Sequence, residues 1–334
     1  MTSPSWTFSG ARVVDLTQHS LPVQHRLNVA ARVFEETVSR AATATGGART
    51  YSFTRKGADV PADWSDLLRC LELRSVLARS PESDSDTAIF EADSQHLELD
   101  RLFGGQVLAQ FVRVAAAACP DKAVKSLHVQ FIREGKGRRA VRYVARHVRI
   151  GRSFATLAIA AEQDGRVLAT ASVSLHVIES GPESRAFTSA VPSVLSPRFH
   201  IGHGLLPWEA RSADDLNALT AQPPDYDLWM RTPTVDPALA EALVAYASDM
   251  NLIGTALRPF AGYNHHGNGS AWTAATTSHT VWFHRPFRTD DWLLLRHHSP
   301  VAAHSRCFGR GDVFTENGTL VASFAQEGLL RFHS

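Results

Sequence analysis

Ser126–Arg133, SLHVQFIR, reappears 152 residues later in the chain as Ser278–Arg285, SHTVWFHR. Two further segments repeat at offsets of 154 and 153 residues: Arg152–Phe154 with Arg306–Phe308, and Asp164–Thr170 with Asn317–Ser323. A nearly constant offset over three segments in the same order indicates a duplicated unit of about 110–130 residues, which is a usual domain size. The sequence therefore predicts two copies of one fold in tandem.

Each copy has the pattern of a helix followed by an antiparallel meander. Helical periodicity is expected over 107–119 in the first copy and over 237–257 in the second. Strand-like runs follow in both copies: 126–132, 140–150, 153–163 and 167–177, then 273–283, 292–299, 305–315 and 320–332. Asp164-Gly165 and Asn317-Gly318 are hairpin-turn signals at equivalent places. This is a duplicated α+β pattern, and periodicity alone supports no more than that. A helix wrapped by a curled antiparallel sheet, twice in tandem, is what a hot-dog fold would give.

Four regions are predicted along the chain. Residues 1–62 belong to neither copy and are expected to form an N-terminal extension that is poorly ordered or loosely docked. The first unit is expected over 63–180 and the second over 205–334. Between them, 181–204 is rich in Ser, Pro and Gly and is interpreted as a linker.

Composition excludes several classes of partner. The chain has 334 residues, of which 44% are apolar and 20% charged, and its net charge is +1. This charge gives no general attraction to nucleic acid or to an anionic membrane. No apolar run reaches the roughly 18 residues of a spanning helix, and the start lacks a secretory signal layout. We therefore expect a cytoplasmic protein with no nucleic-acid or membrane partner.

Cysteine and histidine do not form a recognisable ligand motif. The 3 cysteines are too few and too far apart for a disulfide framework or a Cys-based metal site. Eight of the 16 histidines lie in the second copy and are dense between His265 and His304, but they show no H-E-x-x-H or Cys/His ligand spacing. No metal site is predicted.

The two copies differ where chemistry would need polar groups. Gln326 lies in the last strand-like run at the position that Val173 occupies in the first copy. A buried amide without a hydrogen bond costs about 1–3 kcal/mol, so a Gln there indicates a specific partner. Asp249 interrupts the apolar face of the second helical stretch. The asymmetry predicts one working site per chain, in the second copy.

Four motifs resemble the signatures of the type II acyl-CoA thioesterases, the bacterial thioesterase II family: Phe103–Val107 (FGGQV), Tyr246–Asn251 (YASDMN), His279–Phe287 (HTVWFHRPF) and Gln326–Gly328 (QEG). The resemblance extends from about residue 64 to the C-terminus. It implies a double hot-dog that hydrolyses fatty acyl-CoA to free acid and CoA. It also implies a catalytic trio of Asp249, Thr276 and Gln326, with Thr277 as the adjacent alternative to Thr276. A homo-oligomer, dimer or tetramer, is implied as well.

The trio has the right chemistry for hydrolysis by water without a cofactor. Asp249 can act as general base, and burial would raise its pKa into a useful range. The hydroxyl of Thr276 and the amide of Gln326 can hold a water without adding charge. No G-x-S-x-G motif is present, which disfavours an acyl-enzyme route. Acyl-CoA is the expected partner, and its pocket is expected between the two units.

Two other functions remain compatible with these residues. A hot-dog hydratase acting on enoyl thioesters would be a different enzyme on the same fold, and the trio fits it less well. A non-catalytic acyl-CoA-binding lipid sensor would bind the same ligand without turnover. Release of CoA distinguishes the sensor from the hydrolase.

Overall fold

The computed structural model describes residues 63–76, 86–97, 99–184, 191–202 and 204–333. These residues all fall within one compact unit. The predicted N-terminal extension, 1–62, lies outside the described residues. In the described part of the chain, no helix is long and apolar enough to cross a membrane.

The described part of the first copy contains two helices and six strands. They are α2 (Trp64–Cys70), β1 (Arg74–Ser75), β2 (Thr87–Ala92), α3 (Gly104–Ala118), β3 (Ala123–Phe131), β4 (Val141–Ile150), β5 (Phe154–Gln163) and β6 (Arg166–His176). The predicted helix and four strands are confirmed. The β5–β6 turn forms at Asp164-Gly165, where both residues have positive φ, +52° and +70°, as a two-residue hairpin of this type requires.

The second copy repeats this order after the short helix η1 (Pro197–Phe199). Its elements are β7 (Glu209–Arg211), β8 (Asp225–Arg231), η2 (Pro237–Leu239), α4 (Ala240–Ser248), α5 (Leu252–Leu257), η3 (His265–Gly267), β9 (Trp272–Phe283), β10 (Leu293–Ala303), β11 (Arg306–Thr315) and β12 (Leu320–Phe332). The four predicted strands are confirmed. The predicted continuous helix over 237–257 is instead broken between Ser248 and Leu252. The break falls at Asp249, whose side chain is held by other elements, as described below.

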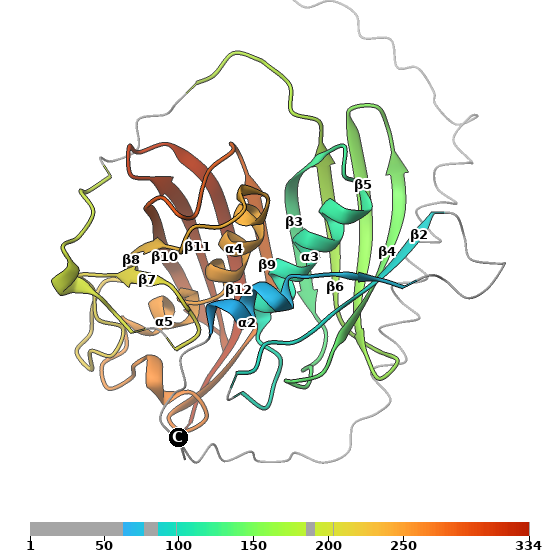
Figure 1. Ribbon diagram of the computed structural model, residues 1–334. Helices are drawn as coiled ribbons and strands as arrows, with labels where there is room; N and C mark the ends of the chain where they lie inside the picture. The colour runs from blue at the N-terminus through green and yellow to red at the C-terminus, as the bar shows by residue number, and fades with distance from the viewer. Residues whose placement is uncertain (1–62, 77–85, 98, 185–190, 203, 334) are drawn as a thin grey trace, which may run out of the picture. The chain divides into compact units, whose positions relative to one another are not determined.

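The twelve strands of the described residues form one antiparallel sheet with a palindromic order. The order is β1-β2-β4-β5-β6-β3-β9-β12-β11-β10-β8-β7, so each strand of one copy has its counterpart at the mirrored place. The copies join edge to edge through β3 and β9, which lie side by side at the centre (Figure 1). Ser126 pairs with Trp282 and Gln130 with Ser278, symmetrically about the His128–Thr280 pair. The duplicated segment therefore pairs with its own repeat around a local two-fold axis.

The helices α3 and α4 pack against each other and share one apolar core with both halves of the sheet. The ring of Phe103, directly before α3, contacts Tyr246 of α4 edge-on, with 5.0 Å between ring centroids. Burial of each large side chain in such a core contributes about 1.5–3 kcal/mol. This shared core fixes the start of α3 against the end of α4, and the candidate site lies at that junction.

Candidate active site

Asp249 lies at the end of α4, and its carboxylate points toward the first turn of α3 in the other copy. Its Oδ1 accepts a hydrogen bond from the Thr276 hydroxyl at 2.9 Å. The backbone N–H of Gly105 also donates to this carboxylate. Burial raises the pKa of Asp249 from 3.8 to about 7, although the bonds from Thr276 and Gly105 oppose the shift. The carboxyl can therefore accept and release a proton near neutral pH.

The first turn of α3 is built to receive this carboxylate. Its N-cap, Phe103, has no side-chain cap bond, and the turn has no acidic residue of its own. A Cβ on Gly104 would lie 2.6 Å from Asp249 Oδ2, and one on Gly105 would lie 2.4 Å from the Tyr246 carbonyl oxygen. Both positions therefore need glycine. Asp249 supplies, from the other copy, the negative charge that a helix N-terminus favours.

Thr276 reaches Asp249 because of a bulge in β9. The pairing of β9 with β12 shifts between Glu327 and Gly328, so that Glu327 pairs with Ser278, Gly328 pairs with Thr276, and Thr277 has no opposite residue. An extra residue of this kind changes which side chains share a face. Thr277 is exposed and donates to the Glu327 carbonyl oxygen. Of the two threonines that the sequence left open, the structure places Thr276 at the carboxylate.

Gln326 completes the connection between the three predicted residues. It lies on β12 and is 2% exposed. Its Nε2 donates to Thr276 Oγ1 at 3.1 Å, and Thr276 in turn donates to Asp249. Residues from a helix end and two neighbouring strands, 77 positions apart at most (249 to 326), thus form one hydrogen-bonded chain. All three predicted residues are brought together.

Two further residues extend this chain, and the sequence analysis did not single them out. Gln326 Oε1 lies 2.9 Å from Nδ1 of His279, and Nε2 of His279 lies 2.8 Å from the hydroxyl of Ser248, which precedes Asp249. The signal for His279 was present in the repeat, because the aligned residue of the first copy is Leu127. The pair His279–Gln326 in β9 and β12 corresponds to the pair Leu127–Val173 in β3 and β6.

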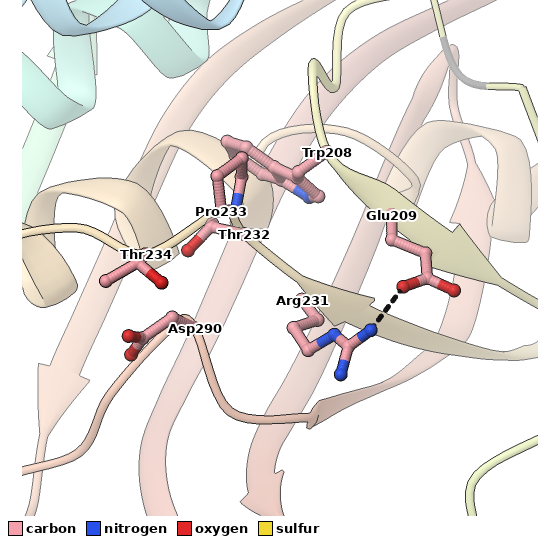
Figure 2. A pocket seen from close by; sticks show the side chains of 7 residues that line it. All are labelled: Trp208, Glu209, Arg231, Thr232, Pro233, Thr234 and Asp290. Carbon is pink, nitrogen blue, oxygen red and sulfur yellow. Dashed lines mark hydrogen bonds and ion pairs between the residues drawn. The ribbon is translucent and has the colours of Figure 1, made fainter.

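Two clefts formed by described residues lie away from this hydrogen-bonded chain. One, of about 390 Å³, is at the β7–β8 edge of the sheet (Figure 2) and is lined by Trp208, Glu209, Arg231, Thr232, Pro233, Thr234 and Asp290. Another, of about 320 Å³, lies at the corresponding end of the first copy, beside the β5–β6 turn. Neither is lined by Asp249, Thr276 or Gln326. The predicted acyl pocket between the copies stays a prediction.

Comparison with known proteins identifies the family that this chain matches. The family model for an acyl-CoA thioesterase N-terminal domain matches residues 94–176, and that for the C-terminal domain matches 180–330. Acyl-CoA thioesterase 2 of Haemophilus influenzae is 30% identical over 276 residues, which cover 74% of this chain and 93% of that protein.

Solved structures agree with the fold. The acyl-CoA thioesterase II TesB2 of Mycobacterium marinum superposes with a TM-score of 0.64 at 27% identity, covering 80% of this chain and 98% of its own. A hot-dog protein from Alicyclobacillus acidocaldarius superposes with a TM-score of 0.58 at 19% identity, over 80% of this chain and 98% of its own. The second likeness concerns the fold alone. Together with the palindromic sheet, these neighbours confirm the predicted double hot-dog.

Proposed function

Because the chain belongs to the acyl-CoA thioesterase family, we propose that Asp249, Thr276 and Gln326 form the site where water attacks the thioester. The protein is a thioester hydrolase that converts acyl-CoA to a carboxylic acid and CoA. The observation that carries the assignment of the site is the chain Gln326→Thr276→Asp249, which ends on a buried carboxylate with a pKa of about 7. The thioesterase relatives do not favour the sensor or the hydratase.

Asp249 acts as the general base in this proposal. Its carboxylate removes a proton from water as the water oxygen forms a bond to the thioester carbonyl carbon. The tetrahedral intermediate then expels the thiolate of CoA, and the proton held by Asp249 passes to that sulfur. A base with a pKa of about 7 is well matched to this task, because at neutral pH it is partly ionised yet basic enough to take the proton.

Thr276 and Gln326 hold the Asp249 carboxylate and the attacking water in fixed positions relative to each other. The Thr276 hydroxyl is committed to Asp249 as a donor and accepts from Gln326. The amide nitrogen of Gln326 carries a second hydrogen, which can be directed at the water or at the substrate oxygen. Fixed orientation of this kind removes entropy before the reaction begins.

The first turn of α3 supplies positive potential for the developing oxyanion. Its N–H groups lie beside Asp249, one of them from Gly105 already bonded to the carboxylate. Backbone donors of a helix N-terminus stabilise negative charge without reorganising during the reaction. The two glycines let the reacting groups approach this backbone closely.

The test is CoA release from acyl-CoAs of graded chain length, followed with a thiol-reactive dye, for the wild type and for Asp249→Asn. We expect release by the wild type and a loss of about 10³-fold or more in the variant, since the base is removed while the shape of the side chain is kept. Full activity of folded Asp249→Asn would show that the site is elsewhere. In H₂¹⁸O, label should enter the free acid, and a stable acyl-protein adduct would contradict direct attack by water.

Several finer properties belong to the same proposal. Fatty acyl chains are the proposed substrates, and the reaction as written needs only water and the thioester, so no cofactor is proposed. A cytoplasmic location is supported by the three cysteines, which are all free and buried. Homo-oligomerisation is supported by exposed apolar side chains on the sheet, such as Trp282 on β9, which is 42% exposed. Light scattering on the purified protein would test the oligomer.

A further inference from the structure

The hydrogen-bonded chain at Asp249 does not end at Gln326. It continues through the imidazole of His279 to the hydroxyl of Ser248, which returns it to α4 directly beside Asp249. The chain is therefore a nearly closed loop that starts and ends on adjacent residues of one helix. His279 is 1% exposed and Ser248 is 0% exposed, so water does not compete for these groups.

The ionised carboxylate fixes the direction of every bond in the loop. Asp249 can only accept, so Thr276 must donate its single hydroxyl hydrogen to it. The Thr276 oxygen is then left to accept from the Gln326 amide nitrogen, which turns Gln326 Oε1 toward His279. An amide oxygen only accepts, so His279 must carry its hydrogen on Nδ1.

The remaining nitrogen of His279 then sets the role of Ser248. Burial lowers the pKa of His279 to about 4, which keeps the imidazole neutral at physiological pH. A neutral imidazole with its hydrogen on Nδ1 can only accept at Nε2. Ser248 Oγ lies 2.8 Å from that nitrogen and 2.9 Å from the Ala245 carbonyl oxygen. Its one hydrogen satisfies the imidazole when the loop is complete.

The fold provides a specific reason for His279 to face this way. The bulge at Thr277 places Thr276 and His279, three residues apart, on the same inner face of β9. Without the bulge, the alternation of side chains would put them on opposite faces. The imidazole also stacks on Phe324 of β12, with 6.2 Å between ring centroids and 14° between planes. Packing and hydrogen bonds thus agree on one orientation.

We propose that His279, supported by Ser248, is the positioning residue that fixes the amide orientation of Gln326 and so holds Thr276 and Asp249 ready for the attacking water. If His279 did not donate to Gln326 Oε1, the amide could rotate and present oxygen instead of nitrogen to Thr276. Thr276 would then lose its donor and could turn its own hydrogen away from Asp249. The proposal rests on the proposed role of Asp249 and adds residues that do not touch substrate.

The central test replaces His279 with the two side chains that separate orientation from packing. His279→Leu removes the donor and introduces the residue that the first copy has at this place, Leu127. His279→Asn keeps an N–H donor near the position of Nδ1. We expect kcat to fall about 10- to 100-fold in His279→Leu with KM within about twofold, and most of the loss to be restored in His279→Asn. Equal losses in both variants would overturn the proposal.

His297 offers a matched control. It is also a buried neutral histidine on the inner side of the sheet, it contacts Phe324 edge-on at 5.4 Å, and its Nδ1 bonds the Tyr226 carbonyl oxygen instead of the site. His297→Leu should lower thermal stability about as much as His279→Leu does, and it should leave kcat within about twofold. A comparable loss of kcat in both variants would mean that His279 acts only through the stability of the fold.

A double-mutant cycle shows whether His279 acts through Gln326. In a Gln326→Ala background, the added His279→Leu should change kcat by less than about twofold, because the group that it positions is gone. Losses that multiply would overturn the proposal.

The pH dependence of kcat/KM gives a separate test of the loop, because a change in packing alone would not shift the apparent pKa of its acid limb. Arg101 acts on the charge of Asp249 and His128 on that of His279, and both remain in every variant. The loop stabilises the ionised carboxylate of Asp249 through the hydrogen bond that Thr276 donates. Loss of the loop should therefore raise the apparent pKa of the acid limb, by up to about one pH unit in His279→Leu. An unchanged apparent pKa of the acid limb together with a large loss of kcat would contradict the positioning role of the loop.

Failure of the positioning role and failure of the proposed active site give different results. If Asp249→Asn is inactive while His279→Leu has wild-type kcat and pH profile, the proposed active site stands and only the positioning role fails. If Asp249→Asn is fully active, the proposed site itself fails, whatever His279→Leu does. Ser248→Ala should show a smaller loss than His279→Leu, since it removes only the far end of the loop; a larger loss would contradict the order of the chain.

Discussion

The two copies place different chemistry at matching positions of one architecture. In the second copy, the inner face of the central strands presents Thr276, His279 and Gln326. The first copy has Val124, Leu127 and Val173 at these places, buried to 6%, 0% and 0% exposure. The strand bulge is kept in both, since the pairing of β3 with β6 shifts between Val124 and Ser126. Both copies therefore have the strand bulge, while only the second copy has these three polar side chains.

The difference shows how the copies divide the work. The first copy contributes no side chain to the trio, but the first turn of its helix α3 receives Asp249 at Gly104 and Gly105. The second copy contributes the polar side chains and gives up helix continuity at Asp249. Each copy is thus incomplete alone: one supplies backbone donors in an apolar setting, and the other supplies the acid–base groups.

Among exchanges of side chains between the two copies, the largest effect is expected when Gln326 is replaced by the residue of the first copy. Gln326→Val matches Val173 and removes both the donor to Thr276 and the acceptor for His279. Loss of one preorganised donor typically costs about 10²–10³-fold in kcat, and we expect a loss in this range. The thermal midpoint should fall, because the buried Nδ1–H of His279 is left without its acceptor. CoA-release kinetics and calorimetry measure both. Wild-type kcat would show that the polar asymmetry is not what makes the second copy work.

The next effect tests the contribution of the first copy. Gly104→Ala places a methyl group 2.6 Å from Asp249 Oδ2 in the present geometry, so the carboxylate must move. We expect kcat to fall about 10²-fold, since a displacement of this size misaligns the base. Gly181→Ala is the control, because a Cβ there meets nothing within 4 Å. Equal activity of the two variants would mean that the start of α3 does not shape the site.

A polar group placed in the first copy should cost stability and add no function. Val173→Gln puts an amide opposite Leu127, where no partner corresponds to His279. An unsatisfied buried amide costs about 1–3 kcal/mol, so the denaturant midpoint should fall. Val173→Met, which adds length without polarity, is the control and should cost less. Activity appearing in Val173→Gln combined with Asp249→Asn would reveal a second latent site and contradict the division of work.

Asp249 itself should destabilise the second copy at high pH. Its pKa is about 7 in the folded chain against 3.8 for an ordinary Asp. Between these values the unfolded chain loses the proton first, so the free energy of unfolding falls as pH rises through this window and stays lower above it. Asp249→Asn carries no charge, so its stability gain over wild type should be larger at pH 8 than at pH 5. From pH 5 to pH 8 this difference is at most about 3 kcal/mol, because the unfolded carboxyl is already ionised at pH 5 and only the interval up to the folded pKa of about 7 contributes.

Chemical unfolding at the two pH values measures this gain. The control is Asp291→Asn, because the side chain of Asp291 is exposed to solvent and its replacement removes a carboxylate that was never taken out of water. Its effect on the free energy of unfolding should therefore be small. A gain for Asp249→Asn that is the same at both pH values would show that the carboxylate is not desolvated.

Much of the architecture could be predicted from local pattern, and the parts that could not depend on contacts between distant residues. Alternating strands and the Asp164-Gly165 turn follow from short-range preferences, and the structure confirms them. The break after Ser248 was not predicted, because a single polar residue such as Asp249 in an otherwise apolar helical stretch does not by itself end a helix. It depends on bonds from Asp249 to Gly105 and Thr276, which lie 144 and 27 positions away along the chain (249 − 105 and 276 − 249).

The role of His279 was missed for a related reason. The residues next to a histidine in a strand do not show what its side chain does. The bonds of His279 to Gln326 and Ser248 form only when β9, β12 and α4 are packed together. The repeat carried the signal nevertheless, since apolar Leu127 is its counterpart. A comparison of all inward positions of the two copies, instead of Gln326 alone, would have found it.

The smallest expected effect, that of Thr277→Val, tests the bulge on which this comparison depends. Thr276→Val and Thr277→Val are equivalent changes on adjacent residues, and only the first removes a bond to Asp249. Thr277→Val loses a bond to the Glu327 carbonyl on the exposed side of β9, so its kcat should stay within about twofold of wild type, while Thr276→Val should lose about 10²-fold. Steady-state kinetics on both proteins, with matched thermal midpoints, decides between them. If Thr277→Val lost as much activity as Thr276→Val, the strand register would be wrong by one residue. Thr276 and His279 would then no longer share a face, and the loop through Gln326 could not close.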